Sequence, residues 1–200
     1  MPQTSARQIG RPRSEESKTA ILEATWKLLK TTTLRDLSIE AIARESGVGK
    51  TTIYRWWSCK AAVVMDAFLE KVSPEIQFPK DVSATEALTS QMAALVKAFS
   101  GEYGRIVAQI IAEGQADPAV LASYRDRFLS ARRAAAKAIL QQGIESGEFN
   151  PDIDLELAID ILYGAIYFRL LVRHLPLDRQ FASELSQQAL KVVEAIQKNP

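Results

Sequence analysis

The chain of 200 residues has one cysteine, Cys59, and one histidine, His174. A lone cysteine excludes an intrachain disulfide framework and a zinc site made from a cysteine cluster. A chain without disulfides suits a reducing compartment, so we expect a cytoplasmic protein. The sequence also shows no nucleophile–base pair and no metal-spaced cluster of His and Cys, so we expect no catalysis, no metal and no cofactor.

Long hydrophobic runs are missing too. The most apolar tract, Leu155 to Leu175, carries two acids and two arginines, and its longest uncharged run covers residues 161–168. A membrane span needs about 20 predominantly apolar residues, so this tract predicts a buried helix of a soluble protein. Residues 1–13 are polar and basic with no apolar core, so we expect a flexible arm there and no secretory signal.

The sequence shows no alternation of period two and no internal repeat, whereas apolar residues recur at helical spacing nearly throughout. Prolines and glycines fall between the expected elements, with the exception of Gly164, which we attribute to the close approach of another helix. An all-α protein of about nine helices is predicted. The expected helices, the first of them capped by Ser14, cover approximately residues 15–31, 39–46, 50–56, 58–72, 84–100, 103–115, 118–146, 155–174 and 179 onward.

Charge is unevenly distributed along the chain. Residues 1–60 hold 11 Lys and Arg against 6 Asp and Glu, whereas residues 61–200 hold 14 against 18. A basic N-terminal part suggests a polyanionic partner. We therefore expect a basic arm (1–13), a small helical domain (14–60) and a larger helical domain (61–200).

The stretch Gly47-Val48-Gly49-Lys50-Thr51-Thr52 resembles the end of a phosphate-binding loop. That motif requires a further glycine at position 44 and a preceding strand. Position 44 is Arg44, and "SIEAIARE" has helical periodicity, so a nucleotide site is not expected. The other interpretation is a helix-turn-helix, with Val48 as the apolar residue of the turn.

In a helix-turn-helix, the second helix presents one face to DNA. Ile53 and Trp57, four residues apart, would face the core. The opposite side would present hydrogen-bond donors and aromatic edges that suit base edges and phosphates in a major groove. These candidate DNA contacts are Lys50, Thr51, Thr52, Tyr54, Arg55 and Trp56.

The run "LSIEAIARESGVGKTTIYRWWSCKAAVV" resembles the DNA-binding domain of the tetracycline-repressor (TetR) family of bacterial regulators. The match covers about residues 14–65, and the helices that follow match the family in layout. The resemblance implies that Tyr54 and Lys60 contact phosphates, and Ser38 can contact the DNA backbone as well as cap its helix. Gly49 replaces the usual Ser cap, and Trp56 stands where Tyr or His is common, so the operator sequence is not predicted.

The arm contains Arg11 and Arg13 around Gly10-Arg11-Pro12, which resembles the centre of an AT-hook. An extended Gly-Arg-Pro segment can place an arginine in a narrow A·T minor groove. A solvated tail is the equal alternative.

The family resemblance also implies a ligand cavity and a dimer interface in the second domain. Candidate cavity residues are the aromatic side chains Tyr103, Tyr124, Phe128, Tyr163 and Tyr167. For Arg132 and Arg133 an ion pair or a solvated face is favoured over contact with an acidic ligand. The helix at 155–174 is apolar nearly all round, which indicates burial by its own domain and by a partner. With the last helix it would form a four-helix interface through Ile166, Leu170, Leu185, Val192 and Ile196.

The expected function is a transcriptional repressor that binds double-stranded DNA as a homodimer and responds to an unidentified small molecule. An activator or a regulator without a ligand is the alternative within the same fold. The alternatives from other classes are an all-helical enzyme and a non-specific architectural DNA-binding protein.

Overall fold

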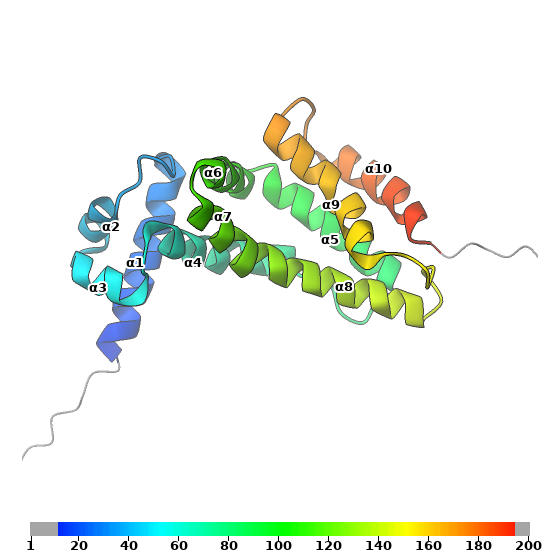
Figure 1. Ribbon diagram of the computed structural model, residues 1–200, viewed down its shortest axis with the longest axis horizontal. Coiled ribbons are helices and arrows are strands. Elements are labelled where there is room, and N and C mark those ends of the chain that lie inside the picture. The colour runs from blue at the N-terminus through cyan, green and yellow to red at the C-terminus, as the bar shows by residue number, and fades with distance from the viewer. Residues whose placement is uncertain (1–11, 195–200) are drawn as a thin grey trace, which may run out of the picture. The chain divides into compact units, whose positions relative to one another are not determined.

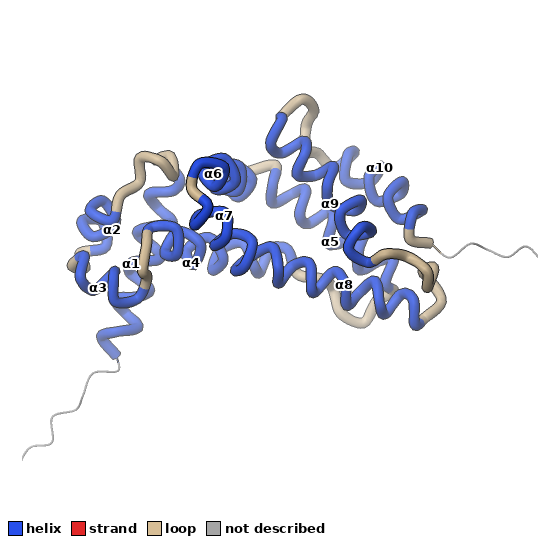
Figure 2. The backbone as a smooth tube through the Cα atoms, in the orientation of Figure 1, coloured by secondary structure: helices blue, strands red, loops and turns tan. Residues whose placement is uncertain are grey.

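The computed structural model describes residues 12–194, and within that range the protein is all-α, as the sequence predicts (Figures 1 and 2). The only β pairing among these residues is an isolated bridge between Phe149 and Glu194. The helices are α1 (Pro12–Thr31), α2 (Ile39–Ser46), α3 (Lys50–Trp56), α4 (Lys60–Val72), α5 (Ala84–Phe99), α6 (Glu102–Ala116), α7 (Pro118–Tyr124), α8 (Ser130–Glu145), α9 (Leu155–Val172) and α10 (Arg179–Ala189).

Helices α7 and α8 form one continuous helix, because a π-helical segment, η2 (Arg125–Leu129), joins them without a break. Counted this way, the described residues hold nine α-helical segments, which is the number that the sequence predicts. Two short 3-10 segments, η1 (Ser73–Ile76) and η3 (Leu190–Val192), follow α4 and α10. No helix in the described range is long and apolar enough to cross a membrane.

The chain divides into two compact units, one ending at Ala67 and one beginning at Phe68. The division falls within α4, whereas the sequence suggests a division at residues 60 and 61, where this helix begins. Helices α1 to α3 and the first half of α4 belong to the first unit, and α5 to α10 belong to the second.

In the first unit, local signals begin and end the short helices. Ser38 has an extended backbone, and its Oγ accepts a hydrogen bond of 3.1 Å from the amide of Ala41, so it caps α2 as predicted. Gly47 ends the same helix in the left-handed conformation, at φ 69°, which glycine adopts at little cost. Two helix starts differ from the expectation: α1 begins at Pro12 and includes Ser14 instead of being capped by it, and α4 begins at Lys60 instead of near residue 58.

In the second unit, α5 is the central helix: it contacts η1, α6, α8, α9 and α10. Its buried face includes Leu88, Met92 and Leu95. Oxygen atoms of Ser83, Asp117, Asp154 and Asp178 accept hydrogen bonds from amides in the first turns of α5, α7, α9 and α10 respectively. The hydrophobic core of this unit also contains Leu140, Phe149, Ile159, Leu162 and Val193.

Candidate nucleic-acid interface and ligand pocket

Helices α2 and α3 form a helix-turn-helix whose inner side is apolar. Ile42 and Ile53 are fully buried, Trp57 is nearly so, and Val48 in the turn is half-buried. Helix α3 therefore turns its other side to solvent. Lys50, Thr51, Tyr54 and Arg55 are exposed there, and Thr52 is half-buried. The predicted side chains thus share one accessible face, with Trp56 as the exception.

The ammonium of Lys50 forms an ion pair with a residue that the sequence does not single out. Its Nζ lies 3.0 Å from Oε1 of Glu40, in the first turn of α2, and both side chains are more than half exposed. The hydrogen bond from Lys50 lowers the pKa of Glu40, so the carboxylate is charged at neutral pH. Glu40 therefore places a negative charge beside the most N-terminal side chain of α3.

We expect the substitution Glu40→Gln to increase DNA affinity by about two- to fivefold at low salt. It removes a charge that repels phosphates and frees Lys50 from its ion pair, both of which are surface effects of modest size. Fluorescence anisotropy with a labelled operator over a series of salt concentrations measures this. A lower affinity for the glutamine variant would show instead that the Glu40 carboxylate itself contributes to recognition.

Lys60, a predicted phosphate contact, forms hydrogen bonds with backbone carbonyl groups of the protein. Its Nζ donates hydrogen bonds to the carbonyl oxygens of Leu34 (2.8 Å) and Arg35 (3.4 Å), in the connection between α1 and α2. The half-buried ammonium thus holds this connection against the start of α4. A phosphate would meet Lys60 through the N–H group that these bonds leave free.

The two tryptophans at the end of α3 interact with other residues of the first unit. Trp57 is buried, as predicted, and its Nε1 donates a 2.7 Å hydrogen bond to Asp66 in α4. Trp56 is half-buried, and the ammonium of Lys18 in α1 lies 5.5 Å from its ring centroid. Its indole Nε1 is buried without a partner among the described residues, so this N–H does not point to solvent as a phosphate contact would require. The structure therefore does not place Trp56 on the exposed face.

The two arginines of the arm are at or beyond the limit of the described residues. Gly10 and Arg11 of the Gly-Arg-Pro segment lie outside them, whereas Pro12 is the first residue of α1. Arg13 is in the first turn of α1. A minor-groove contact by this arm remains a prediction.

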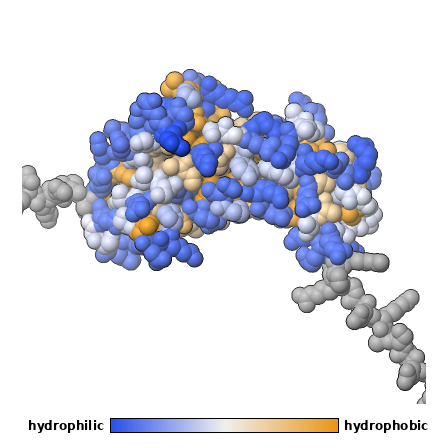
Figure 3. All heavy atoms as spheres, turned by 180° about the vertical axis from the view of Figure 1, so that it is seen from behind, coloured by the Kyte–Doolittle hydropathy of each residue, from blue (hydrophilic) through white to orange (hydrophobic). Residues whose placement is uncertain are grey.

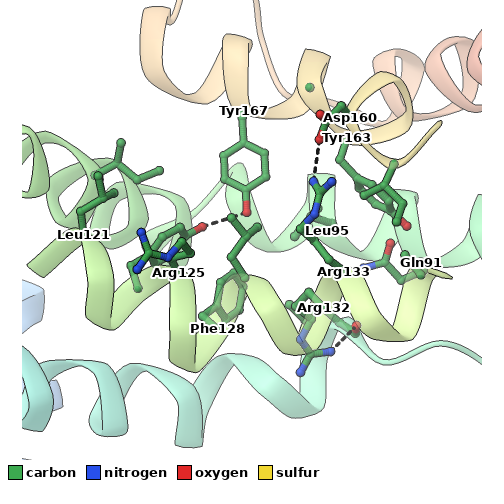
Figure 4. Close-up of a pocket in the computed structure, with 17 residues that line it drawn as sticks. Gln91, Leu95, Leu121, Arg125, Phe128, Arg132, Arg133, Asp160, Tyr163 and Tyr167 are labelled. Carbon is green, nitrogen blue, oxygen red and sulfur yellow. Dashed lines mark hydrogen bonds and ion pairs between the residues drawn. The ribbon is translucent and has the colours of Figure 1, made fainter. Parts of the chain in front are cut away.

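The second unit contains a pocket of about 450 Å³ between α5, α6, α7, α8 and α9 (Figure 4). Its size falls within the range of small-molecule sites, and apolar atoms contribute most of the surface that lines it. The apolar lining comprises Ile76, Leu95, Ile111, Leu121, Phe128, Leu129, Ala136 and Ile159, and the polar lining comprises Gln91, Tyr124, Tyr163, Tyr167, Arg125, Arg132, Arg133 and Asp160.

Four of the five aromatic residues predicted for a cavity line this pocket, and Tyr103 does not. The hydroxyl groups of Tyr124 and Tyr167 lie 2.8 Å apart and form a hydrogen bond, which Figure 4 shows. Burial raises the pKa of Tyr124, Tyr163 and Tyr167, so all three phenols are neutral at physiological pH. The Tyr163 hydroxyl and Oε1 of the buried Gln91 have no hydrogen-bond partner among the described residues.

The π-helical segment η2 contributes to the same pocket. The amide of Ser130 donates a hydrogen bond to the carbonyl of Arg125, five residues earlier, whereas an α-helix joins residues four apart. Arg125, Phe128 and Leu129 of this segment all line the pocket. Phe128 is buried, and its ring packs against those of Phe68 and Tyr124. π-Helical turns within α-helices often occur at functional sites.

Gly164 lines the pocket, and the expectation that another helix packs closely against it is wrong. Apart from its two chain neighbours and the backbone of its own helix, a Cβ at this position would have no atom within 4 Å. The glycine therefore leaves space in α9 beside the pocket. No such space exists at Gly143 in α8, where a Cβ would lie 2.1 Å from the ring of Phe149.

We expect Gly164→Ala to raise the free energy of unfolding by about 0.5–1 kcal/mol, because alanine favours the helix and the added methyl group meets no atom. Urea denaturation measures this value. Gly143→Ala is the matched control and should destabilise the protein, because the methyl group overlaps Phe149. Destabilisation by both variants would argue against an open site at Gly164.

Two adjacent arginines at the pocket have different surroundings. Arg133 forms ion pairs with Glu156 and Asp160 of α9, and these hydrogen bonds raise its pKa, so the expected ion pair is present. Arg132 has no acidic partner among the described residues. It donates one 3.1 Å hydrogen bond to the carbonyl of Ile76 and lies 6.0 Å from the ring centroid of Phe128. Desolvation by burial lowers the pKa of Arg132.

The residues predicted for a dimer interface do not form one surface. Ile166 and Leu170 are buried in the core of their own unit, Leu185 is half-buried, Val192 is half exposed, and Ile196 lies outside the described residues. The predicted stripe of the last helix also faces inward at Phe181 and Ala189, and its outer side is mostly polar.

The exposed apolar surface lies elsewhere on α9. Apart from Tyr54 and Val192, every large hydrophobic side chain that is exposed in the described residues lies on α9 or directly after it. These side chains, which we call the outer face of α9, are Leu157, Ile161, Phe168, Leu171, Val172 and Leu175. Figure 3 shows that orange hydrophobic atoms do reach the surface of the molecule among blue hydrophilic ones.

Comparisons with known proteins agree with this architecture. The family described as "Bacterial regulatory proteins, tetR family" matches residues 21–66, and "Tetracyclin repressor-like, C-terminal domain" matches residues 79–189. The two matches together cover most of the chain and include both the helix-turn-helix and the pocket helices. The chain belongs to the TetR family.

Relatives of this TetR-family protein are regulators as well. It is 35% identical over 186 residues to the uncharacterized HTH-type transcriptional regulator YdeS of Bacillus subtilis. These aligned residues cover 93% of this chain and 94% of YdeS. The crystal structure of the TetR family transcription regulator SCO0332 is 33% identical, covers 88% of this chain and 97% of its own, and superimposes with a TM-score of 0.76.

A further solved structure shares the fold at lower identity. FadR from Bacillus subtilis in complex with stearoyl-CoA is 18% identical and superimposes with a TM-score of 0.69; the match covers 86% of this chain and 96% of FadR. The family and its members identify this TetR-family chain as a DNA-binding transcriptional regulator. The described residues contain no group of three His, Cys, Asp or Glu side chains that could hold a metal ion.

Proposed function

We propose that this TetR-family regulator is a repressor that binds a pseudo-palindromic operator as a homodimer and releases it when a small molecule occupies the pocket. The observation that carries the proposal is the apolar pocket of about 450 Å³ in the second unit of a chain whose first unit is a helix-turn-helix. The protein would act in the cytoplasm, where bacterial DNA is accessible. The FadR structure with stearoyl-CoA supports a ligand site in this fold.

The exposed side of α3 supplies the contacts to DNA. Lys50, Thr51 and Thr52 stand near the N-terminus of the helix, the part of a recognition helix that usually meets base edges. Arg55 would contact bases and phosphates, and the phenol of Tyr54 would contact phosphate. Ser38 and Lys60 would add backbone contacts beside their structural roles.

The outer face of α9 is the proposed dimer interface, in place of Ile166 and Leu170. Five exposed apolar side chains on α9, with Leu175 directly after it, form a surface of the kind that protein interfaces bury. A two-fold dimer would place two α3 helices about 34–36 Å apart, one turn of DNA. Repression would end when a ligand favours a dimer conformation with another spacing, which requires a higher affinity of the ligand for that conformation.

Selection of bound sequences from a random DNA pool tests this function. A homodimer should enrich a palindrome whose half-sites lie about one helical turn apart. Enrichment of a single half-site would contradict the dimer, and no enrichment would indicate a non-specific DNA-binding protein. Transcription from a promoter that carries the selected sequence then separates a repressor from an activator.

A further inference from the structure

The pocket contains one charged side chain, Arg132, that no group among residues 12–194 neutralises. The two other arginines that line the pocket are both in ion pairs. Arg133 is paired with two carboxylates of α9, and Arg125 is paired with Asp126. Among the described residues no carboxylate lies within ion-pair distance of Arg132. A half-buried guanidinium without a counter-ion is energetically unfavourable, so its presence beside an apolar pocket requires an explanation.

The hydrogen-bonding capacity of Arg132 is mostly unused. A guanidinium has five N–H donors, and Arg132 uses one of them, from Nη1 to the carbonyl of Ile76. The remaining donors are suited to a planar carboxylate, which can accept two parallel hydrogen bonds. Desolvation by burial lowers the pKa of Arg132, and no acidic group in the part of the chain that the structure describes offsets the cost of burying this charge.

The pocket extends from Arg132 across an apolar and aromatic space. Figure 4 shows Tyr167 above, on α9, and Phe128 and Arg132 next to each other below it, with Arg132 on α8. Leu95 and Ile159 add to the apolar lining. A molecule that fills this space would therefore have an apolar body and an anionic group at the end that meets Arg132.

We propose that the effector of this regulator is an amphipathic carboxylate, with Arg132 as the residue that binds its carboxylate group. This rests on the proposed ligand-responsive function and adds the chemical class of the ligand. The buried Gln91, whose Oε1 has no partner among the described residues, would accept a hydrogen bond from an N–H or O–H group of the same ligand. The selectivity would come from charge, and the apolar lining would tolerate different bodies of similar volume.

Matched acids and amides test the ligand class with the full-length protein. Decanoate and decanamide provide an aliphatic body, and naphthaleneacetate and naphthaleneacetamide provide an aromatic one. Isothermal titration calorimetry should show that at least one acid binds about tenfold to a hundredfold more tightly than its amide, as expected for a charge-assisted hydrogen bond. Equal affinity for acid and amide, or no binding of either acid at millimolar concentration, overturns the proposal.

Variants at Arg132 separate ligand binding from a structural role. Arg132→Met keeps an unbranched side chain and should reduce the affinity for the acid to that for the amide, while the amide binds as before. Arg132→Lys retains the charge and should keep part of the preference. Arg127→Met, an exposed position of η2 that does not line the pocket, is the matched control for the loss of one positive charge.

Stability and DNA binding provide the remaining readouts. The melting temperature of Arg132→Met without ligand should be unchanged or higher, because an uncompensated charge is removed. A strong decrease, with equal loss of acid and amide binding, would assign Arg132 to packing instead. Release of operator DNA by a neutral compound would leave the ligand-responsive function intact and contradict only the carboxylate class.

Discussion

The substitution Phe168→Glu is expected to convert the proposed dimer into a monomer and to reduce operator affinity by about a hundredfold or more. Phe168 is 58% exposed on the outer face of α9, between Ile161 and Val172. A glutamate there would be buried in the dimer opposite apolar side chains without a partner. A monomer would meet only one half-site and would lose the base and phosphate contacts of the other.

Size-exclusion chromatography with light scattering gives the mass of the variant, and anisotropy with the selected operator gives its affinity. The matched control is Gln188→Glu, which adds the same charge on the polar, exposed side of α10 and should remain dimeric. Circular dichroism should show the same helix content for both variants. A dimeric Phe168→Glu variant with unchanged affinity would exclude the outer face of α9 as the interface.

The second large effect is expected for Lys50→Ala combined with Arg55→Ala. Both side chains are exposed on α3, and Lys50 is paired with the exposed Glu40, so the helix-turn-helix should remain folded. Each base contact contributes about 1–3 kcal/mol, so the double variant should bind the operator about a hundredfold more weakly. The dependence of affinity on salt should also become shallower, since fewer counterions are released.

Anisotropy over a range of salt concentrations measures both effects. Lys97→Ala combined with Arg127→Ala removes two positive charges from exposed positions of the second unit and serves as the control. The control should bind the operator almost as tightly as the unchanged protein. If the two double variants lose affinity equally, net charge and not the α3 face would determine DNA binding.

The sequence alone predicted the first unit well because its signals are local. Ser38 and Gly47 begin and end α2 through their own side chain and backbone, and Ile42, Ile53 and Trp57 face inward by helical periodicity. Such features depend on residues a few positions away. The ion pair of Lys50 with Glu40 and the hydrogen bonds of Lys60 to the connection after α1 depend on how helices pack, and the sequence did not indicate them.

In the second unit, the sequence determined that the chain is helical, where its helices are capped, and that α9 is apolar on several sides. Only the tertiary structure decided which side of α9 faces inward: Ile166 and Leu170 enter the core of the unit, and Phe168 remains exposed. The physical reason is that a helix with apolar residues all round carries no local signal that separates its own core from an interface. The same holds for two adjacent arginines, because only the packing of α8 against α9 gave Arg133 its carboxylates, whereas Arg132 has none within the described range 12–194.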